Sequence, residues 1–324
     1  MLRFLHPPHS SSLLRRWPFY LLVGIAALVP TVVSAHGGGG PGIFQFNPLI
    51  WLALILIGAA YFYGTGIIEQ RDPEAVTPKQ MWYFLGGLSV IFVALQSPID
   101  TYADNSFWVH MIQHLLLILA VPPLLLLGTP AAFLRPLTRK PALFAAARAL
   151  VNPGVAWLVS TGAFLAWHIP ALYNAAVLDA KIHALEHLCF IATAILFWWP
   201  VYSPLPELPR LSRANKVGYL ALSCQPNVVL GAVLVFAPHA FYGVYAGALH
   251  LGGISPLVDQ QAGGAIMWVP GNMVYLAIMS KLFFDWFNEK ESAESSAFGV
   301  RGSQFGVDTI SSHSELPTPN SPPS

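Results

Sequence analysis

Two pairs of histidines with helical spacing are the residues of this sequence best suited to chemistry. His110 and His114 are four residues apart, and so are His183 and His187. Residues at positions i and i+4 lie on the same face of an α-helix, and imidazole nitrogens bind copper, zinc, iron and nickel. The spacing therefore predicts two helix faces, each of which presents a pair of metal-binding groups.

A fifth histidine, His168, is expected at a similar depth. At a rise of about 1.5 Å per residue, all five lie within about 9 Å of the same ends of three predicted helices. Ionisable groups at that depth are costly and usually face the interior of a helix bundle or a wet cavity. The candidate metal or haem ligands are therefore His110, His114, His168, His183 and His187. The alternative is that single histidines only hydrogen-bond between helices.

Four further residues are weaker candidates. Glu186 and Asp259 could bind the metal or orient the imidazoles, and Met267 could bind Cu(I) or belong to the apolar core. If the chain is cleaved after Ala35, the α-amine and imidazole of His36 could chelate Cu(II). Otherwise His36 belongs to a flexible leader.

The composition requires a membrane around these sites. Of the 324 residues, 55% are hydrophobic and 10% are charged, and the mean hydropathy is +0.57. Soluble domains carry about 25% charged residues, so a soluble enzyme and a disordered chain are both excluded. A net charge of +1 without a basic stripe gives no support for nucleic-acid binding. The two cysteines form no CxxC motif.

The predicted fold is an all-α bundle of seven transmembrane helices. Residues 1–35 read as a signal peptide, with an uncleaved first transmembrane helix as the alternative, and residues 36–46 form a Gly-rich outer leader. The membrane domain covers residues 47–287, and residues 288–324 form a disordered cytoplasmic tail. The expected spans are 47–68, 81–98, 108–128, 153–172, 183–202, 217–237 and 263–287.

The distribution of basic residues orients this bundle. Of the thirteen Lys and Arg residues after residue 35, twelve fall in one set of loops and at the C-terminal end, and only Lys181 falls in the other set. Cytoplasmic loops carry the excess of Lys and Arg. The mature chain is therefore expected to run from an outer N-terminus to an inner C-terminus, which places the histidine layer on the outer side.

Four ordered motifs carry a resemblance to a known family. They are WVHMIQHLLL from Trp108 with PPLLLLGTP from Pro122; WHIPALYNAA from Trp167; HALEH from His183 with FWWP from Phe197; and SPLVDQQAGG from Ser255 with MWVPG from Met267. Over roughly residues 45 to 287, the sequence resembles the polytopic CtaG-type cytochrome c oxidase assembly factors. The apparent leader and the Ser/Pro-rich tail depart from that family.

The resemblance implies a multi-pass protein of the bacterial inner membrane that helps to mature a haem-copper oxidase. On that basis we expect no enzymatic turnover. We expect copper bound by the periplasmic histidines, a haem-copper oxidase subunit as recipient, and a periplasmic copper chaperone as a candidate partner.

Two other functions stay open from the residues themselves. His183-x-x-Glu186-His187 spells the H-x-x-E-H pattern of some zinc metallohydrolases, although a third carboxylate ligand would have to come from Asp259. Histidines facing one another on different helices could also ligate haem, as in a cytochrome b, or belong to a copper importer. Copper is therefore the expected metal, with zinc or haem as alternatives.

Overall fold

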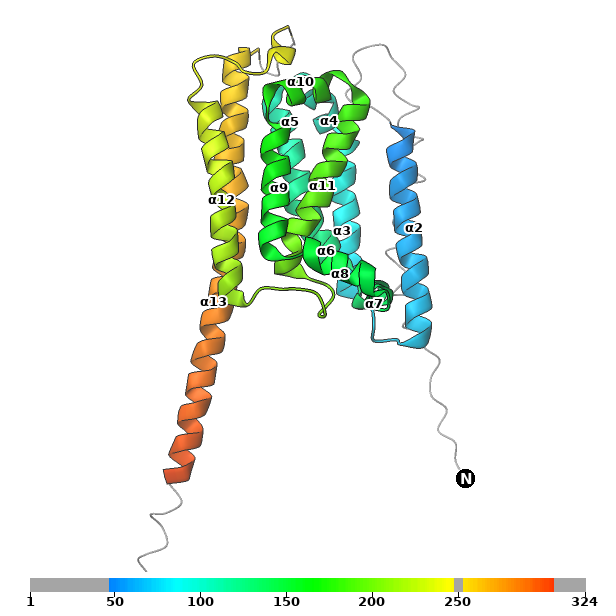
Figure 1. The fold of residues 1–324 in the computed structure, drawn as a ribbon, viewed down its shortest axis with the longest axis vertical. Coiled ribbons are helices and arrows are strands. Elements are labelled where there is room, and N and C mark those ends of the chain that lie inside the picture. Colours follow the sequence, from blue (N-terminus) through cyan, green and yellow to red (C-terminus); the bar gives the residue numbers. More distant parts are fainter. Residues whose placement is uncertain (1–46, 248–252, 306–324) are drawn as a thin grey trace, which may run out of the picture.

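The structure is a computed structural model that describes residues 47–247 and 253–305, with side chains described up to residue 291. Every regular element in these ranges is a helix (Figure 1). The predicted signal peptide, the Gly-rich leader and His36 lie outside the described residues. The described part of the chain is all-helical, and its apolar helices agree with the membrane protein that the composition predicts.

Within the described residues, five helical stretches are long and apolar enough to cross a membrane. They are α2 (Pro48–Arg71), the continuous stretch Phe107–Gly128, α11 (Ala180–Tyr202), α12 (Arg213–Val235) and the first part of α13 (Pro256–Phe305). A sixth results if α8 (Pro141–Leu150) and α9 (Pro153–Trp167), which meet at a bend of 64°, form one broken span. The expected total of seven spans and the expected orientation stay predictions.

The helix expected at 81–98 is α3 (Pro78–Leu95), which is capped by a reciprocal pair of hydrogen bonds between Thr77 and Gln80. It has 18 residues but is not among the five apolar stretches, because it opens with polar Lys79 and Gln80. Ser97 then caps the short α4 (Pro98–Ala103). The helix thus ends at Leu95, three residues before the expected end of the span.

The stretch Phe107–Gly128 contains a local change of helix type. It consists of α5 (Phe107–Leu115), a π-helical turn η1 (Leu116–Ala120) and α6 (Val121–Gly128). Pro122 has no N–H with which to bond the carbonyl of Ile118, four residues earlier. The indole Nε1 of Trp198 in α11 donates to that carbonyl at 2.9 Å instead. The irregular turn is therefore held by a neighbouring helix.

The span expected at 153–172 is divided. α9 ends at Trp167, and α10 (Pro170–Leu178) begins after the two residues His168 and Ile169. α10 and α4 lie at one end of the bundle, and the short α7 (Ala131–Thr138) and α8 lie at the opposite end (Figure 1). Pro170 disfavours helical backbone at Ile169, which is extended (φ −64°, ψ 126°). The chain therefore turns at His168 and returns through Asp179 into α11.

Helices α12 and α13 pack closely at one edge of the bundle (Figure 1). A Cβ added at Gly231 would lie 3.0 Å from the carbonyl oxygen of Gly264. A Cβ added at Gly264 would likewise lie 3.0 Å from the carbonyl oxygen of Gly231. Only glycine permits this approach at the two positions. The short η2 (Gly243–Tyr245) lies in the connection between the two helices.

The expectation for the C-terminal tail is corrected by the structure. A disordered tail from residue 288 was expected, whereas α13 continues to Phe305. The segment after Asn288 contains three Glu, one Lys and two Ala up to residue 297, which favour helix, and no proline before Pro317. Residues 306–324 lie outside the described residues.

Candidate metal centre

The first half of the site is carried by the first turns of α5. His110 and His114 are buried on one face of this helix, with 1% and 3% of their surfaces exposed. The helix is anchored by Asp259, which comes from the first turn of α13. Its carboxylate accepts hydrogen bonds from the Ser106 hydroxyl at 2.9 Å and from the N–H groups of Phe107 at 2.8 Å and Trp108 at 3.0 Å.

The second half comes from the start of α11. Asp179 caps this helix by accepting from the N–H groups of Lys181 at 2.8 Å and Ile182 at 3.2 Å. One turn further in, His187 is buried, whereas His183 is half-buried. The two helices therefore present one histidine pair each, as the i,i+4 spacing predicts.

The two pairs meet in one group. One ring nitrogen from each of His110, His114, His183 and His187 lies within 4.8 Å of the others. We call these residues the four-histidine group. Within it, the Nε2 atoms of His110 and His114 are 2.8 Å apart. Four nitrogens at about 2.0 Å from one metal ion lie about 3.3 Å apart, so small side-chain rotations would bring the group to that geometry.

Buried polar atoms without partners support the fit of a cation here. Among the residues that the structure describes, the Nε2 atoms of His183 and His187 have no hydrogen-bond partner. Both carboxylate oxygens of Glu186 are buried and likewise have no hydrogen-bond partner in this part of the chain, and one lies 3.9 Å from Nε2 of His114. A buried carboxylate is costly unless it is paired or coordinates a metal. A cation among the imidazoles would balance the charge of Glu186, and this donor set suits copper or zinc.

Two tyrosine hydroxyls lie within hydrogen-bond distance of the Nδ1 atom of His110. The hydroxyls of Tyr173 in α10 and Tyr245 in η2 lie 2.9 and 3.0 Å from its Nδ1, and 2.9 Å from each other. Burial raises the pKa of both phenols well above the ordinary value, so they stay protonated, and the Tyr245 hydroxyl donates to the carbonyl of Ala103 at 3.3 Å. A hydroxyl oxygen that accepts the N–H of Nδ1 leaves Nε2 of His110 with its lone pair directed at the group.

The other predicted site residues take different places. Nδ1 of His168 donates to the carbonyl of Phe164 at 2.7 Å, and this residue is not part of the four-histidine group. Asp259 is occupied at the start of α5, where it orients a helix. The side chain of Met267 packs in an apolar cluster with Phe107 and Met111. Of the three weaker candidates that the structure describes, only Glu186 lies beside the group.

Tyr173, Tyr245 and Gln113 contribute to the site although the sequence alone predicts no role for them. The amide of Gln113 donates to the carbonyl of Ala94 at 2.9 Å and to Asp100 at 2.8 Å, which ties α5 to α3 and α4. A buried glutamine between two candidate ligands is itself a signal that could have been used. Tyr245 has no such signal, because it lies in a loop far along the chain.

A comparison with protein families matches most of the described chain. Residues 59–289 match the model of the cytochrome c oxidase caa3 assembly factors. This range includes the four-histidine group, Glu186, both tyrosines and Asp259.

The curated relatives found are distant and longer. An uncharacterized protein of Mycobacterium leprae is 23% identical over 267 residues, which cover 75% of this chain and 39% of the relative. An uncharacterized protein of Mycobacterium bovis is 20% identical over 298 residues, which cover 85% of this chain and 44% of the relative. The chain thus spans less than half of the length of either relative. No solved structure gives a significant match.

Proposed function

The chain belongs to the family of cytochrome c oxidase caa3 assembly factors, and from this premise we propose that it binds copper at the four-histidine group and delivers it to the oxidase. The recipient is a haem-copper oxidase subunit, and a periplasmic copper chaperone supplies the metal. The protein works in the bacterial inner membrane, with the group facing the periplasm. The twelve-to-one distribution of basic residues supports this orientation.

The observation that carries the proposal is the convergence of four imidazoles beside the buried carboxylate of Glu186, which has no hydrogen-bond partner within the described chain. A structural role for the histidines would pair their nitrogens with hydrogen-bond partners, as happens at Nδ1 of His168. At the four-histidine group, the nitrogens instead face one another. Such an arrangement is unfavourable without a shared proton or cation, and it suits a metal that all four can reach.

The burial of the group also suits transfer. His110, His114 and His187 are buried, while His183 is half-buried at the start of α11. Copper would therefore enter and leave past His183. Release to a partner requires only exchange of imidazole ligands, without turnover of an organic substrate, so we propose a carrier and not an enzyme.

A zinc-dependent hydrolase is the second candidate, because Glu186 stands between His183 and His187 in the H-x-x-E-H pattern. Its unpaired oxygens near His114 could act as a general base. Four imidazoles argue against it, since catalytic zinc sites keep three protein ligands and one open position. Chelator-sensitive hydrolysis by the zinc-loaded protein would favour this candidate.

Haem and copper import receive less support from the geometry. If two of these histidines bound a haem iron, the other pair would occupy the space of the macrocycle, because all four nitrogens lie within 4.8 Å. A path for import needs free polar groups deeper in the bundle. The amide nitrogen of Asn227, one candidate for such a path, is used in a hydrogen bond to the carbonyl of Met267 at 2.7 Å.

The test is the metal content of purified protein. Wild type and a variant with all four histidines changed to alanine are loaded with Cu(I), washed and measured by inductively coupled plasma mass spectrometry. We expect about one copper per chain in wild type and none in the variant. The control is His239→Ala, which removes an exposed histidine outside the group and should keep the copper. Equal copper in wild type and the quadruple variant would refute the site.

The delivery step needs a second readout. Membranes from a strain that carries His110→Ala and His114→Ala should contain the protein but lack oxidase activity. The same strain with His239→Ala should keep that activity. Full oxidase activity in the double variant would contradict delivery by this site, even if copper binds in vitro.

A further inference from the structure

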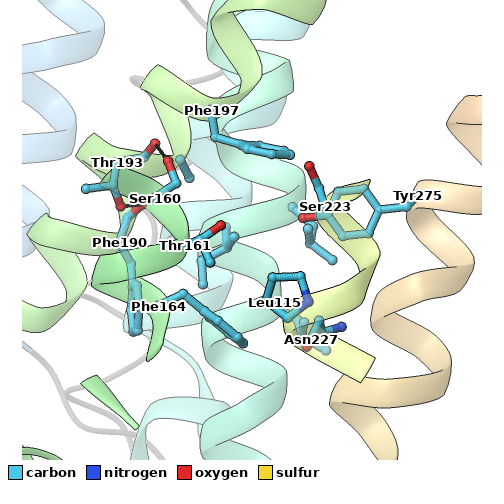
Figure 2. A pocket seen from close by; sticks show the side chains of 14 residues that line it. Leu115, Ser160, Thr161, Phe164, Phe190, Thr193, Phe197, Ser223, Asn227 and Tyr275 are labelled. Atoms are coloured by element: carbon cyan, nitrogen blue, oxygen red, sulfur yellow. Dashed lines mark hydrogen bonds between the residues drawn. The ribbon is translucent and has the colours of Figure 1, made fainter. Parts of the chain in front are cut away.

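A pocket that the described helices enclose is too small for an organic ligand. It lies between α9, α11, α12 and α13 and has a volume of about 70 Å³, whereas sites for small organic molecules occupy about 300–1,000 Å³. One polar group in its wall is already used, because the Ser160 hydroxyl donates to the carbonyl of Thr193 at 2.5 Å (Figure 2). A further organic ligand would therefore have to bind on the surface of the helices.

The surface formed by α7 and α8 is strongly cationic. Four exposed basic side chains lie on these helices and at their junction: Arg135, Arg139, Lys140 and Arg148. We call these four residues the cationic surface. The sequence contains no acidic residue between Asp104 and Asp179. In the described part of the chain, none of the four forms an ion pair or a side-chain hydrogen bond.

Apolar contacts fix α7 and α8 on the end of the bundle. Phe133 of α7 packs with Tyr61 of α2, and their ring centroids are 5.6 Å apart. Leu134 of α7 and Phe144 of α8 pack in one cluster with the buried Leu205. The cationic surface is therefore held in place before any ligand binds, which lowers the entropic cost of binding.

Helix α8 lies where the headgroups of a bilayer are expected. α7 and α8 lie at one end of the bundle (Figure 1), and α8 meets α9 at a bend of 64°. If α9 crosses the membrane, α8 therefore runs closer to the membrane plane than to its normal. Its 10 residues extend about 15 Å, too short for an apolar core of about 30 Å.

Exposed leucines lie beside the cations of α8. Leu143 and Leu150 are 52% and 48% exposed, and Arg148 lies in the last turn of the same helix. Apolar side chains next to Lys and Arg are typical of helices that bind at a membrane surface. The leucines would contact acyl chains, and the cations would contact headgroups.

We propose that the cationic surface binds the phosphate group of an anionic phospholipid. Arg and Lys bind phosphate through charge-assisted hydrogen bonds. A zwitterionic lipid carries a cationic group that these side chains repel, and a soluble phosphate has no acyl chains for Leu143 and Leu150. In the expected orientation the surface faces the cytoplasmic leaflet, whose anionic lipids attract basic segments. The proposal does not depend on copper at the four-histidine group.

The experiment measures lipid binding to the detergent-purified full chain by native mass spectrometry. The protein is titrated with phosphatidylglycerol, and phosphatidylcholine with the same acyl chains is the comparison lipid. Glycerophosphoglycerol, which is the headgroup without acyl chains, tests for binding of a soluble phosphate. Arg139→Gln/Lys140→Gln removes two charges from the cationic surface, and Arg139→Lys keeps the charge.

The matched control is Arg71→Gln/Lys79→Gln. It removes two exposed charges from the turn between α2 and α3, which lies at the same end of the bundle (Figure 1). This turn also contains Asp72 and Glu74, so its positive charge is offset locally. The control therefore separates the cationic surface from basic residues in general at this end of the bundle.

We expect wild type to prefer phosphatidylglycerol to phosphatidylcholine. Each basic side chain near an anionic lipid surface contributes about fivefold to affinity, so Arg139→Gln/Lys140→Gln should bind phosphatidylglycerol about 25-fold more weakly. Arg139→Lys and the control should bind it like wild type, and all variants should elute from gel filtration like wild type.

Four results would overturn the proposal. Wild type binds both lipids equally, or Arg139→Gln/Lys140→Gln keeps the affinity for phosphatidylglycerol. Alternatively, the control or Arg139→Lys loses as much affinity as that double variant. Finally, glycerophosphoglycerol binds as tightly as the lipid, which would assign the surface to a soluble phosphate.

Discussion

Removal of the Asp259 carboxylate should loosen the helix that carries two of the four histidines. Asp259 accepts three hydrogen bonds at the start of α5 and does not belong to the four-histidine group. Asp259→Ala would leave the two N–H groups of the first turn and one hydroxyl without a partner. The prediction is therefore a loss of stability in the metal-free protein, together with a partial loss of metal affinity.

The size of the effect follows from the contacts. A side chain that caps a helix is worth about 0.5–2 kcal/mol, and each buried group left unsatisfied costs about 1–3 kcal/mol. Water that enters the space left by the carboxylate would satisfy part of the uncapped turn, so we expect Asp259→Ala to lower the free energy of unfolding by about 3 kcal/mol. Asp259→Asn keeps one acceptor oxygen and should cost about half as much. Residues that orient metal ligands typically contribute 10–100-fold to affinity, and this range applies to both variants.

The assay has two parts. Unfolding of the metal-free protein by SDS in mixed micelles, followed by circular dichroism, gives the change in stability. Competition for Cu(I) with a chelator whose copper complex is coloured gives the affinity of the protein for Cu(I). The matched control is Asp285→Ala, a half-exposed aspartate on the same helix that pairs with Lys281 at 2.6 Å. That surface change should alter stability by less than about 0.5 kcal/mol.

Two results would refute this reasoning. If Asp259→Ala unfolds like wild type, the hydrogen bonds to α5 do not stabilise the first turn. If the variant keeps its metal-free stability but binds no copper at all, Asp259 acts as a ligand. Either result would return this residue to the role of a candidate ligand that its position in the sequence allows.

Three further predictions rest on other parts of the fold. Burial raises the pKa of Asp100 to about 6. Between about pH 4 and 6 the folded state therefore binds more protons than the unfolded state, and the stability of the fold should fall as the pH rises through this range. Asp100→Asn should remove this pH dependence of the melting temperature, which thermal melts at a series of pH values would measure. Gly128→Ala should lower the melting temperature, because its Cβ would lie 2.5 Å from the backbone nitrogen of Phe84 in α3. The control Gly162→Ala adds a Cβ with no other atom within 4 Å and should leave the melting temperature unchanged. Trp198→Phe leaves the carbonyl of Ile118 unpaired and should destabilise the protein by about 1–3 kcal/mol, which SDS unfolding would measure; an unchanged midpoint would show that the π-helical turn does not need this contact.

The helical spacing of the histidines made much of the site predictable. A separation of four residues puts two side chains on one face, whatever the rest of the fold does. Both pairs are therefore found as expected, and the structure brings the two faces together. The sequence does not encode helix order in the bundle in a readable way, so the separation of His168 from the group could not be foreseen. That residue follows the end of α9 at Trp167, where its ring hydrogen-bonds within its own turn.

Residues that act across long distances in the chain were harder to interpret. Asp259 and Met267 were both candidates because of their chemistry, but their roles depend on which helix packs against α13. Tyr245 reaches His110 from 135 residues away. The helical extension to Phe305 was missed for a different reason, since a polar Glu- and Ser-rich segment is compatible with both a disordered tail and an exposed helix.

The contact between Asp259 and Ser106 also sets an order of events during biosynthesis. The two residues are 153 positions apart, and at about 5–20 residues per second the ribosome needs about 8–30 s to make the intervening chain. Throughout this interval, α5 has emerged without the carboxylate that holds its first turn. Both histidine pairs are already present when α11 is made, but their alignment is completed only when α13 enters the membrane. The four-histidine group can therefore reach its final geometry only after α13, the last apolar helix, has been inserted and Asp259 has bonded to the first turn of α5.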